Sequence, residues 1–279
     1  MSISSHQVAA WNASVQVDLR IEPDHPRTVL YLHSEEGPHA SAPFLADLGR
    51  SASIIAPYHP GFGGTARIEQ LKRPRDLAVL YLDLLDRLGA GPVDLVGSSL
   101  GAWIALEMAT IAPAGFSSLV AISPLGMKFN ARDERSFAEV MVTSDEDRRE
   151  LLYKQAGRDP WRDVQSPNLL LEHATQLESF VRYAWEPYLH EPALVPILPR
   201  ASMAALVISG AGDKLVPAGY YGELVSRLPD ARNLVAAGSG HFPDIEEPAA
   251  VATMVREFHA DRSPAPGKPL GVPAERTAN

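Results

Sequence analysis

The chain has 279 residues, which is enough for one large domain with a sizeable hydrophobic core. Its formal net charge of −9 argues against nucleic acid or an anionic membrane as a partner, because both select basic surfaces. The chain contains no cysteine, so disulfides, thiolate chemistry and cysteine-ligated metals are excluded. No signal-peptide pattern opens the sequence and no run approaches about eighteen apolar residues. We therefore expect a cytoplasmic protein without a membrane span.

Predicted strands and helices alternate along the first part of the chain. Alternating apolar and polar residues predict an edge strand over 15–21. A helix is predicted over 74–88, with leucines recurring on one face and Gly89 ending it. Another helix is predicted from Leu100 to Ala112. Continuous apolar runs typical of buried strands lie at 28–32, 52–57, 93–96 and 118–123.

The alternation of predicted strands and helices stops after residue 123 and resumes near residue 205. Predicted elements of the resumed part are a strand over 205–209, a helix over 217–228, a strand over 232–236 and a helix over 246–259. This alternation predicts an α/β fold with a mostly parallel sheet flanked by helices on both faces.

The interruption and the end of the chain complete the predicted organisation. Residues 124–200 are charged, helix-prone at 132–155 and 169–185, and without a strand run, so we interpret them as an inserted helical lid. The tail, 261–279, is rich in proline, glycine and alanine, and we expect it to be disordered. The core domain would then comprise residues 1–123 and 201–260.

A serine motif lies between a predicted strand and a predicted helix. Residues 97–101 read Gly-Ser-Ser-Leu-Gly and match G-x-S-x-G with Ser99 at the centre. In such a turn the central residue takes strained backbone geometry and its hydroxyl projects above the edge of the sheet. Serine still needs a base that removes its proton before it becomes a useful nucleophile.

Candidate partners of Ser99 follow two later strands. Asp213 lies in a glycine turn after the strand at 205–209, and His241 follows the strand at 232–236. Because active sites of parallel sheets form at the carboxyl ends of the strands, we expect the three side chains to meet. His241 would take the proton of Ser99, and Asp213 would fix the imidazole tautomer and stabilise its charged form. Asp244, Glu246 and Glu247 follow His241 too closely to orient it, and we expect them to start the last helix.

With these residues in place, the chain resembles the α/β-hydrolase fold superfamily over roughly residues 15 to 260. Besides the serine motif it has Pro-Gly-Phe-Gly at 60–63, Gly-x-x-Asp-x-x-x-Pro at 210–217 and Gly-His-Phe-Pro-x-x-Glu-Glu-Pro at 240–248. The interruption after Ser123 falls where similar enzymes carry a lid. The resemblance implies a catalytic triad of Ser99, Asp213 and His241.

The resemblance also implies an oxyanion hole and residues near the substrate. In similar proteins two backbone N–H groups bind the oxyanion, and they correspond here to Leu100 and Glu35. This chain departs from the pattern at Ser34, where glycine usually follows the histidine, and at Tyr58, where aspartate is common. The residues we expect to contact the substrate are His33, Ser34, Tyr58, His59, Arg182, Trp185 and Phe242. A structural role below the oxyanion loop is the alternative for His33, and an exposed ion pair is the alternative for Arg182.

The function that these features indicate is hydrolysis of a small carboxylic ester or lactone through an acyl-enzyme, without metal or cofactor. The same triad in relatives cleaves carbon–carbon bonds of diketo acids, which would require Arg182 or Arg158 to face the pocket. Transfer of the acyl group to an acceptor other than water is a further alternative, and a non-catalytic ligand receptor is the alternative from another class. We expect a small-molecule substrate and no nucleic-acid or membrane partner. The sequence leaves the substrate and the oligomeric state open.

Overall fold

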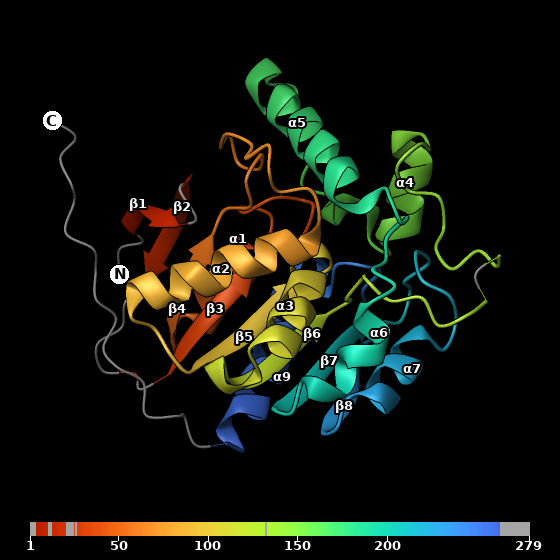
Figure 1. The fold of residues 1–279 in the computed structure, drawn as a ribbon. Helices are drawn as coiled ribbons and strands as arrows, with labels where there is room; N and C mark the ends of the chain where they lie inside the picture. Colours follow the sequence, from red (N-terminus) through yellow and green to blue (C-terminus); the bar gives the residue numbers. More distant parts are fainter. Residues whose placement is uncertain (1–3, 11–12, 21–24, 26, 132, 263–279) are drawn as a thin grey trace, which may run out of the picture.

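The computed structural model describes residues 4–10, 13–20, 25, 27–131 and 133–262, and Figure 1 shows their arrangement. Beyond residue 262 the predicted disordered tail lies outside this described part. Of the helices described, none is long and apolar enough to cross a membrane.

Eight strands of the described residues form one sheet, in the order β1-β2-β4-β3-β5-β6-β7-β8. Their bounds are β1 Ser4–Ala10, β2 Ala13–Arg20, β3 Thr28–Leu32, β4 Ser53–Pro57, β5 Val93–Ser98, β6 Phe116–Ile122, β7 Ala204–Gly210 and β8 Ala231–Ala236. The pairs β1–β2 and β2–β4 are antiparallel, whereas the pairs from β4 to β8 are parallel. The carboxyl ends of six strands therefore share one edge of the sheet, as the predicted α/β fold requires.

One expectation about the edge of the sheet is wrong. Residues 15–21 were expected to form an edge strand, but β1 pairs along the outer side of β2, with Val8 opposite Val15. The sequence pattern did not predict β1. Only part of one face of this short strand is buried, so few of its positions need apolar residues.

Helices cover both faces of the sheet, and each face has its own hydrophobic core. On one face α1 (Ala42–Leu48) packs against α9 (Pro248–Ala260), while α2 (Pro74–Leu88) packs against α3 (Leu100–Ile111) on the other. Every residue of α3 except Ile111 is buried, because the helix lies between the sheet and α2. The predicted helix at 246–259 forms as α9, which Pro248 starts, and a separate short helix, α8 (Pro243–Glu246), precedes it. The predicted helix at 217–228 is shorter, as α7 (Tyr220–Arg227), because Gly219 has φ +84°.

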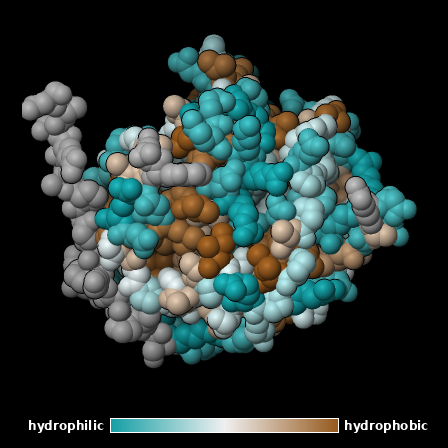
Figure 2. All heavy atoms as spheres, viewed as in Figure 1, coloured by the Kyte–Doolittle hydropathy of each residue, from teal (hydrophilic) through white to brown (hydrophobic). Residues whose placement is uncertain are grey.

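The segment between β6 and β7, which we call the insertion, carries the two helices that stand above the sheet in Figure 1, while its last part lies lower in the same view. Its described residues contain α4 (Asp145–Leu152), α5 (Pro167–Ala184), α6 (Leu194–Ile197) and two short 3-10 turns, η2 (Ala156–Arg158) and η3 (Leu198–Arg200), but no strand. Only 145–152 of the helix expected at 132–155 forms, and Ser144 caps its start by accepting a hydrogen bond from the Asp147 amide. Another 3-10 turn, η1 (Pro113–Gly115), precedes β6. Hydrophobic residues are exposed over the first turn of α5, at the top of Figure 2.

Candidate active site

Ser99 occupies a strained turn between β5 and α3. Its backbone has φ +48° and ψ −109°, a conformation that residues with a side chain rarely adopt. Gly97 and Gly101 make the turn possible, because a Cβ on Gly97 would collide with the Gly101 carbonyl and one on Gly101 with the Leu32 carbonyl. The turn directs the serine hydroxyl toward the carboxyl edge of the sheet, where the other predicted residues lie.

The structure brings Ser99, His241 and Asp213 into one chain of hydrogen bonds. Ser99 Oγ lies 2.8 Å from His241 Nε2, and His241 Nδ1 lies 2.8 Å from Asp213 Oδ2. The side chains of Ser99 and His241 are fully buried. Because a carboxylate accepts only, Nδ1 carries a proton and donates it to Asp213, which leaves Nε2 facing the serine.

Two further donors hold the Asp213 carboxylate. The Tyr221 hydroxyl from α7 donates to Oδ2 at 2.5 Å, and the Leu215 amide donates to Oδ1 at 2.9 Å. Burial would raise the pKa of Asp213, but His241 and these donors together hold that pKa below its usual value. Burial would likewise lower the pKa of His241, but Asp213 outweighs this effect and raises it, with a contribution from Glu35. An anionic carboxylate thus stabilises the imidazolium that proton uptake from a serine would form.

The loop that carries His241 is fastened to the insertion. The His241 amide donates to the Leu152 carbonyl at the end of α4, at 2.6 Å. Glu246 receives the amides of Gly240, at 2.6 Å, and Gln155, at 2.7 Å. Glu246 and Glu247 do lie where α8 ends and α9 begins, as expected, but their side chains also hold the histidine loop.

The loop after β3 places a carboxylate where the sequence indicated only a backbone donor. Glu35 is buried, and its Oε1 lies 3.0 Å from Ser99 Oγ. Its Oε2 accepts a hydrogen bond from the Leu100 amide at 3.4 Å. Leu100 N–H, the first predicted oxyanion donor, therefore points at a site that the Glu35 side chain fills. The role of the Glu35 backbone N–H as second donor stays a prediction.

His33 and His59 are packed below this loop rather than beside Ser99. Their rings lie 3.8 Å apart between centroids, and His33 Nε2 accepts the His59 amide at 3.0 Å. His59 Nε2 lies 2.9 Å from the His33 carbonyl and its Nδ1 lies 2.6 Å from the Tyr81 hydroxyl. Burial lowers the pKa of both rings, to about 3 for His59, so both are neutral and fully bonded. Ser34 is also buried, and its hydroxyl accepts the Glu36 amide at 3.3 Å.

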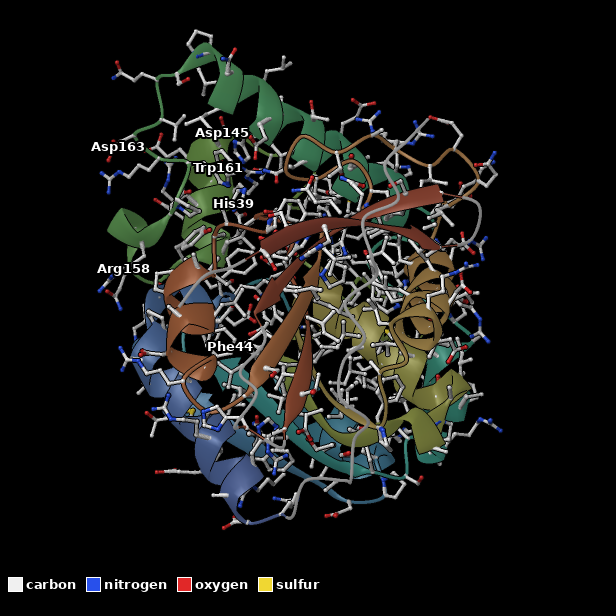
Figure 3. The ribbon with its side chains drawn as sticks, turned by 90° about the vertical axis from the view of Figure 1, so that its left-hand side faces the viewer. His39, Phe44, Asp145, Arg158, Trp161 and Asp163 are labelled. Carbon is white, nitrogen blue, oxygen red and sulfur yellow. The ribbon has the colours of Figure 1, made fainter. Side chains whose placement is uncertain are left out.

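A cavity of about 80 Å³ opens beside Glu35, between the loop after β3 and the insertion. Acidic, basic and apolar side chains line it, including Glu35, Glu36, Asp145, Arg148, Leu152 and Phe180. Burial raises the pKa of Glu36 to about 7. The Trp161 indole donates to the Glu36 carbonyl at 3.2 Å and stacks on His173, and Figure 3 shows it near Asp145 below α5.

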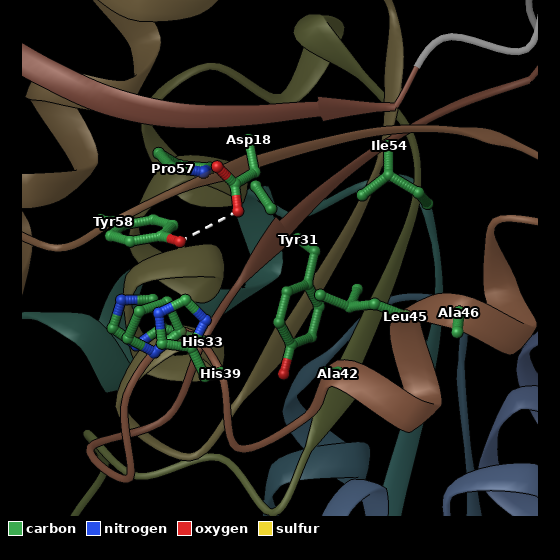
Figure 4. A pocket seen from close by; sticks show the side chains of 12 residues that line it. Asp18, Tyr31, His33, His39, Ala42, Leu45, Ala46, Ile54, Pro57 and Tyr58 are labelled. Atoms are coloured by element: carbon green, nitrogen blue, oxygen red, sulfur yellow. Dashed lines mark hydrogen bonds between the residues drawn. The ribbon is translucent and has the colours of Figure 1, made fainter. Parts of the chain in front are cut away.

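The other residues expected to contact the substrate have the following surroundings in the structure, and their contact with a substrate stays a prediction. Arg182 forms an exposed ion pair with Glu69 at 2.8 Å, which is the alternative that we gave to its contact with the substrate. Trp185 is 48% exposed. Phe242 is fully buried against His241 and Tyr153. Tyr58 donates to Asp18 at 3.0 Å within a larger cavity, of about 140 Å³, that Figure 4 shows. Sequence spacing carries no information on which way such side chains point.

Asp244 was expected only to start a helix, but its carboxylate joins several elements beneath the site by hydrogen bonds. Its Oδ2 accepts hydrogen bonds from Tyr31, at 3.0 Å, and Ser41, at 2.6 Å, while Oδ1 accepts from Ser98 at 2.8 Å. The carboxylate thereby ties β3, the start of α1 and β5 to α8 directly below Ser99. Buried carboxylates require such donors, but the sequence shows no pattern that assigns them.

A mostly parallel sheet with a strained serine after one strand, and with histidine and aspartate converging on it from later loops, defines a hydrolase of the α/β fold. The model of the alpha/beta hydrolase family matches residues 29–254, and the chain belongs to that family.

Curated proteins that are similar in sequence to this chain have different names. Esterase YbfF of Escherichia coli (strain K12) is 28% identical over 205 residues, covering 67% of this chain and 78% of that protein. The 2-hydroxymuconate semialdehyde hydrolase of Pseudomonas sp. (strain CF600) is 27% identical over 237 residues, covering 78% of this chain and 80% of that protein.

Among solved structures, the 2-hydroxy-6-oxo-6-phenylhexa-2,4-dienoate hydrolase of Rhodococcus sp. strain RHA1 has a TM-score of 0.72 and 20% identity over 93% of this chain and 99% of that chain. Naproxen esterase of Bacillus subtilis has a TM-score of 0.71 and 19% identity over 92% and 91%. These structures share the fold.

Proposed function

We propose that this protein is a serine hydrolase that cleaves a small carboxylic ester or lactone, with Ser99 as nucleophile, His241 as base and Asp213 as the acid that orients it. The observation that carries the proposal is the unbroken hydrogen-bond chain from Ser99 Oγ through His241 to Asp213. Serine is activated when an adjacent imidazole takes its proton, and the distances of 2.8 Å lie within proton-transfer reach.

The reaction follows from this arrangement in two halves. Ser99 Oγ attacks the ester carbonyl while His241 Nε2 takes its proton, and the new imidazolium is stabilised by Asp213. His241 then returns the proton to the departing alcohol, and an acyl-enzyme remains on Ser99. Water attacks the acyl-enzyme with His241 again as base and releases the acid. Leu100 N–H, at the start of α3, is oriented to stabilise the negative oxygen of each tetrahedral intermediate.

The insertion at 124–200 is proposed to act as the lid over this site. The cavity beneath it adjoins Glu35, has acidic, basic and apolar walls and a volume of about 80 Å³, and this limited space supports a preference for short acyl or alcohol groups. The insertion also holds the histidine loop through Leu152, so its packing and the position of His241 are linked.

Esterase chemistry is better supported than cleavage of carbon–carbon bonds in diketo acids, although one relative carries the name of such a hydrolase. That reaction needs a free cation to bind the substrate carboxylate. Arg182 is paired with Glu69, and Arg158 is exposed at the outer edge of the molecule in Figure 3. Arg148 lines the cavity, but Glu36 and Asp145 lie beside it. A carboxylate would therefore meet acidic neighbours.

A substrate panel tests the proposal directly. Wild-type protein and the Ser99→Ala variant would be assayed with p-nitrophenyl esters of graded chain length, with lactones and with a ring-fission diketo acid. We expect wild type to favour short esters and Ser99→Ala to lose at least about 10³-fold in kcat/KM. Hydrolysis of the diketo acid alone would instead favour carbon–carbon chemistry. A fluorophosphonate that fails to label Ser99 would remove the case for a serine hydrolase.

A further inference from the structure

Glu35 occupies the position that the carbonyl oxygen of an ester must take during the proposed reaction. One carboxylate oxygen accepts the Leu100 amide at 3.4 Å and the other lies 3.0 Å from the Ser99 hydroxyl. An oxyanion formed at Ser99 would need the same amide and the same space. Glu35 and a substrate carbonyl therefore cannot occupy the site together.

The contacts of Ser99 also determine how many protons the closed site holds. Ser99 Oγ has one proton but two close neighbours, His241 Nε2 and Glu35 Oε1. Both contacts are hydrogen bonds only if one further proton is present. Either imidazolium donates to Oγ while serine donates to the Glu35 carboxylate, or carboxylic acid donates to Oγ while serine donates to neutral imidazole. In both cases the closed site holds one proton more than a neutral histidine and an ionised glutamate would.

Resting on the proposed serine-hydrolase function, we propose that Glu35 is a positioning residue that closes the oxyanion hole in the free enzyme and retains a proton there. Opening the hole for a substrate moves the Glu35 carboxylate toward the adjoining cavity and releases that proton. Glu35 therefore sets both the rate at which Ser99 becomes accessible and the pH at which it does so. Because opening of the site releases this proton, the pH dependence of Ser99 accessibility depends on both side chains that contact the serine hydroxyl, His241 and Glu35.

The charged groups around this pair are fixed by several elements. Those beside the pair or along the adjoining cavity are Asp213, Asp244, Glu36, Asp145 and Arg148. Among the described residues, Glu35 is nevertheless the only carboxylate that forms a hydrogen bond with Ser99. Asp213 reaches the serine only through the imidazole, so replacing Glu35 removes no hydrogen-bond partner of Asp213.

Two variants separate filling of the hole from retention of the proton. Glu35→Ala removes both. Glu35→Gln can still fill the hole, because its amide oxygen can accept from Leu100 and its amide nitrogen can donate to Ser99 without an added proton. Glu69→Gln removes one exposed carboxylate at the Arg182 ion pair and serves as the control for net charge.

The measurement is the second-order rate constant for labelling of Ser99 by a neutral fluorophosphonate, from pH 5 to 9. Ser99 Oγ bonds to phosphorus, the phosphorus–fluorine bond breaks, fluoride leaves and His241 takes the serine proton. We expect Glu35→Ala to be labelled at least about tenfold faster than wild type near pH 6 and Glu35→Gln to be labelled more slowly than Glu35→Ala. The acid limb should move to lower pH in both variants by a similar amount, while Glu69→Gln follows wild type.

Labelling of Glu35→Ala at the wild-type rate or below, or an acid limb that stays in place in both variants, would overturn the role of Glu35. Should Glu35→Ala fail to fold, the acid limb of Glu35→Gln alone decides, since that substitution keeps the shape of the side chain. Absence of labelling in wild type and in every variant would instead refute the proposed serine hydrolase.

Discussion

Tyr221 and His241 bind the same oxygen of Asp213, at 2.5 Å and 2.8 Å. The tyrosine comes from α7, so the orientation of Asp213, the proposed triad acid, depends on a helix that contributes no residue to that triad. This pairing leaves the Asp213 carboxylate with donors on both oxygens, since Leu215 N–H binds the other. A carboxylate held in this way keeps its charge and its direction when the imidazole becomes protonated.

Removing that tyrosine hydroxyl should weaken catalysis without removing any triad residue. For Tyr221→Phe we expect kcat/KM for a short p-nitrophenyl ester to fall about tenfold, because a hydrogen bond to a charged group is lost. The pKa of Asp213 should rise toward its usual value, since Tyr221 helps to lower it. Tyr220→Phe is the matched control, because its hydroxyl accepts from the Met127 amide instead. Equal activity of the two variants would contradict the role assigned to Tyr221.

Asp244 should contribute to stability through its three hydroxyl donors. In Asp244→Asn only one side-chain oxygen remains as an acceptor, so at least one donor from Tyr31, Ser41 or Ser98 loses its partner. We expect the free energy of unfolding to fall by about 1–3 kcal/mol in urea titrations. Ser41→Ala removes a single donor and should cost less than Asp244→Asn; the reverse ranking would argue against Asp244 as the centre of the network.

Glu107 in α3 should make folding depend on pH. Its side chain is fully buried, burial raises its pKa to about 7, and Arg75 at 3.1 Å opposes this shift only in part. A carboxyl whose pKa is higher in the folded state stabilises the fold fully at pH below its unfolded pKa, and this contribution is lost as pH rises through about 7. When the pH rises from 4.5 to 8, the free energy of unfolding should therefore fall by about 2 kcal/mol less in Glu107→Gln than in wild type.

Thermal or urea unfolding at the two pH values measures this difference. The Glu69→Gln variant is the control, because that carboxylate is 70% exposed and its ion pair is expected to contribute little. An identical fall in stability for wild type and Glu107→Gln would show that the buried carboxyl does not titrate in this range.

Gly101 should tolerate no side chain, because its Cβ would overlap the carbonyl oxygens of Leu32 and His33 at the end of β3. Gly101→Ala must shift α3 or β3 and with them Ser99 and the Glu35 loop. We expect a loss of about 2 kcal/mol or more in the free energy of unfolding and a fall in labelling of Ser99. At Gly115 nothing lies within 4 Å of an added Cβ, so Gly115→Ala should match wild type in both measurements.

Local pattern was sufficient for most of the architecture. The helix predicted at 74–88 coincides with α2, since its buried face recurs at helical spacing, and the strand–serine–helix order at 93–111 follows from a short apolar run, two glycines and a buried helix. The same reasoning failed for α1, which is short and was not predicted, and for most of 132–155, where charged residues suggested helix but only α4 forms. In the second segment a distant contact competes with helix formation, since the Ala138 amide donates to the Leu215 carbonyl at 2.9 Å.

The sequence by itself determined the α/β class, the strained position of Ser99 and the edge of the sheet where Asp213 and His241 would emerge, because hydrophobic period and glycine spacing are local properties of the chain. Only the tertiary structure decided that the side chain of Glu35, rather than its backbone alone, meets Ser99 and Leu100. It also decided that Asp244 gathers three hydroxyls and that Arg182 turns outward to Glu69. Such contacts join residues far apart in the chain, and their geometry depends on packing that no local pattern encodes.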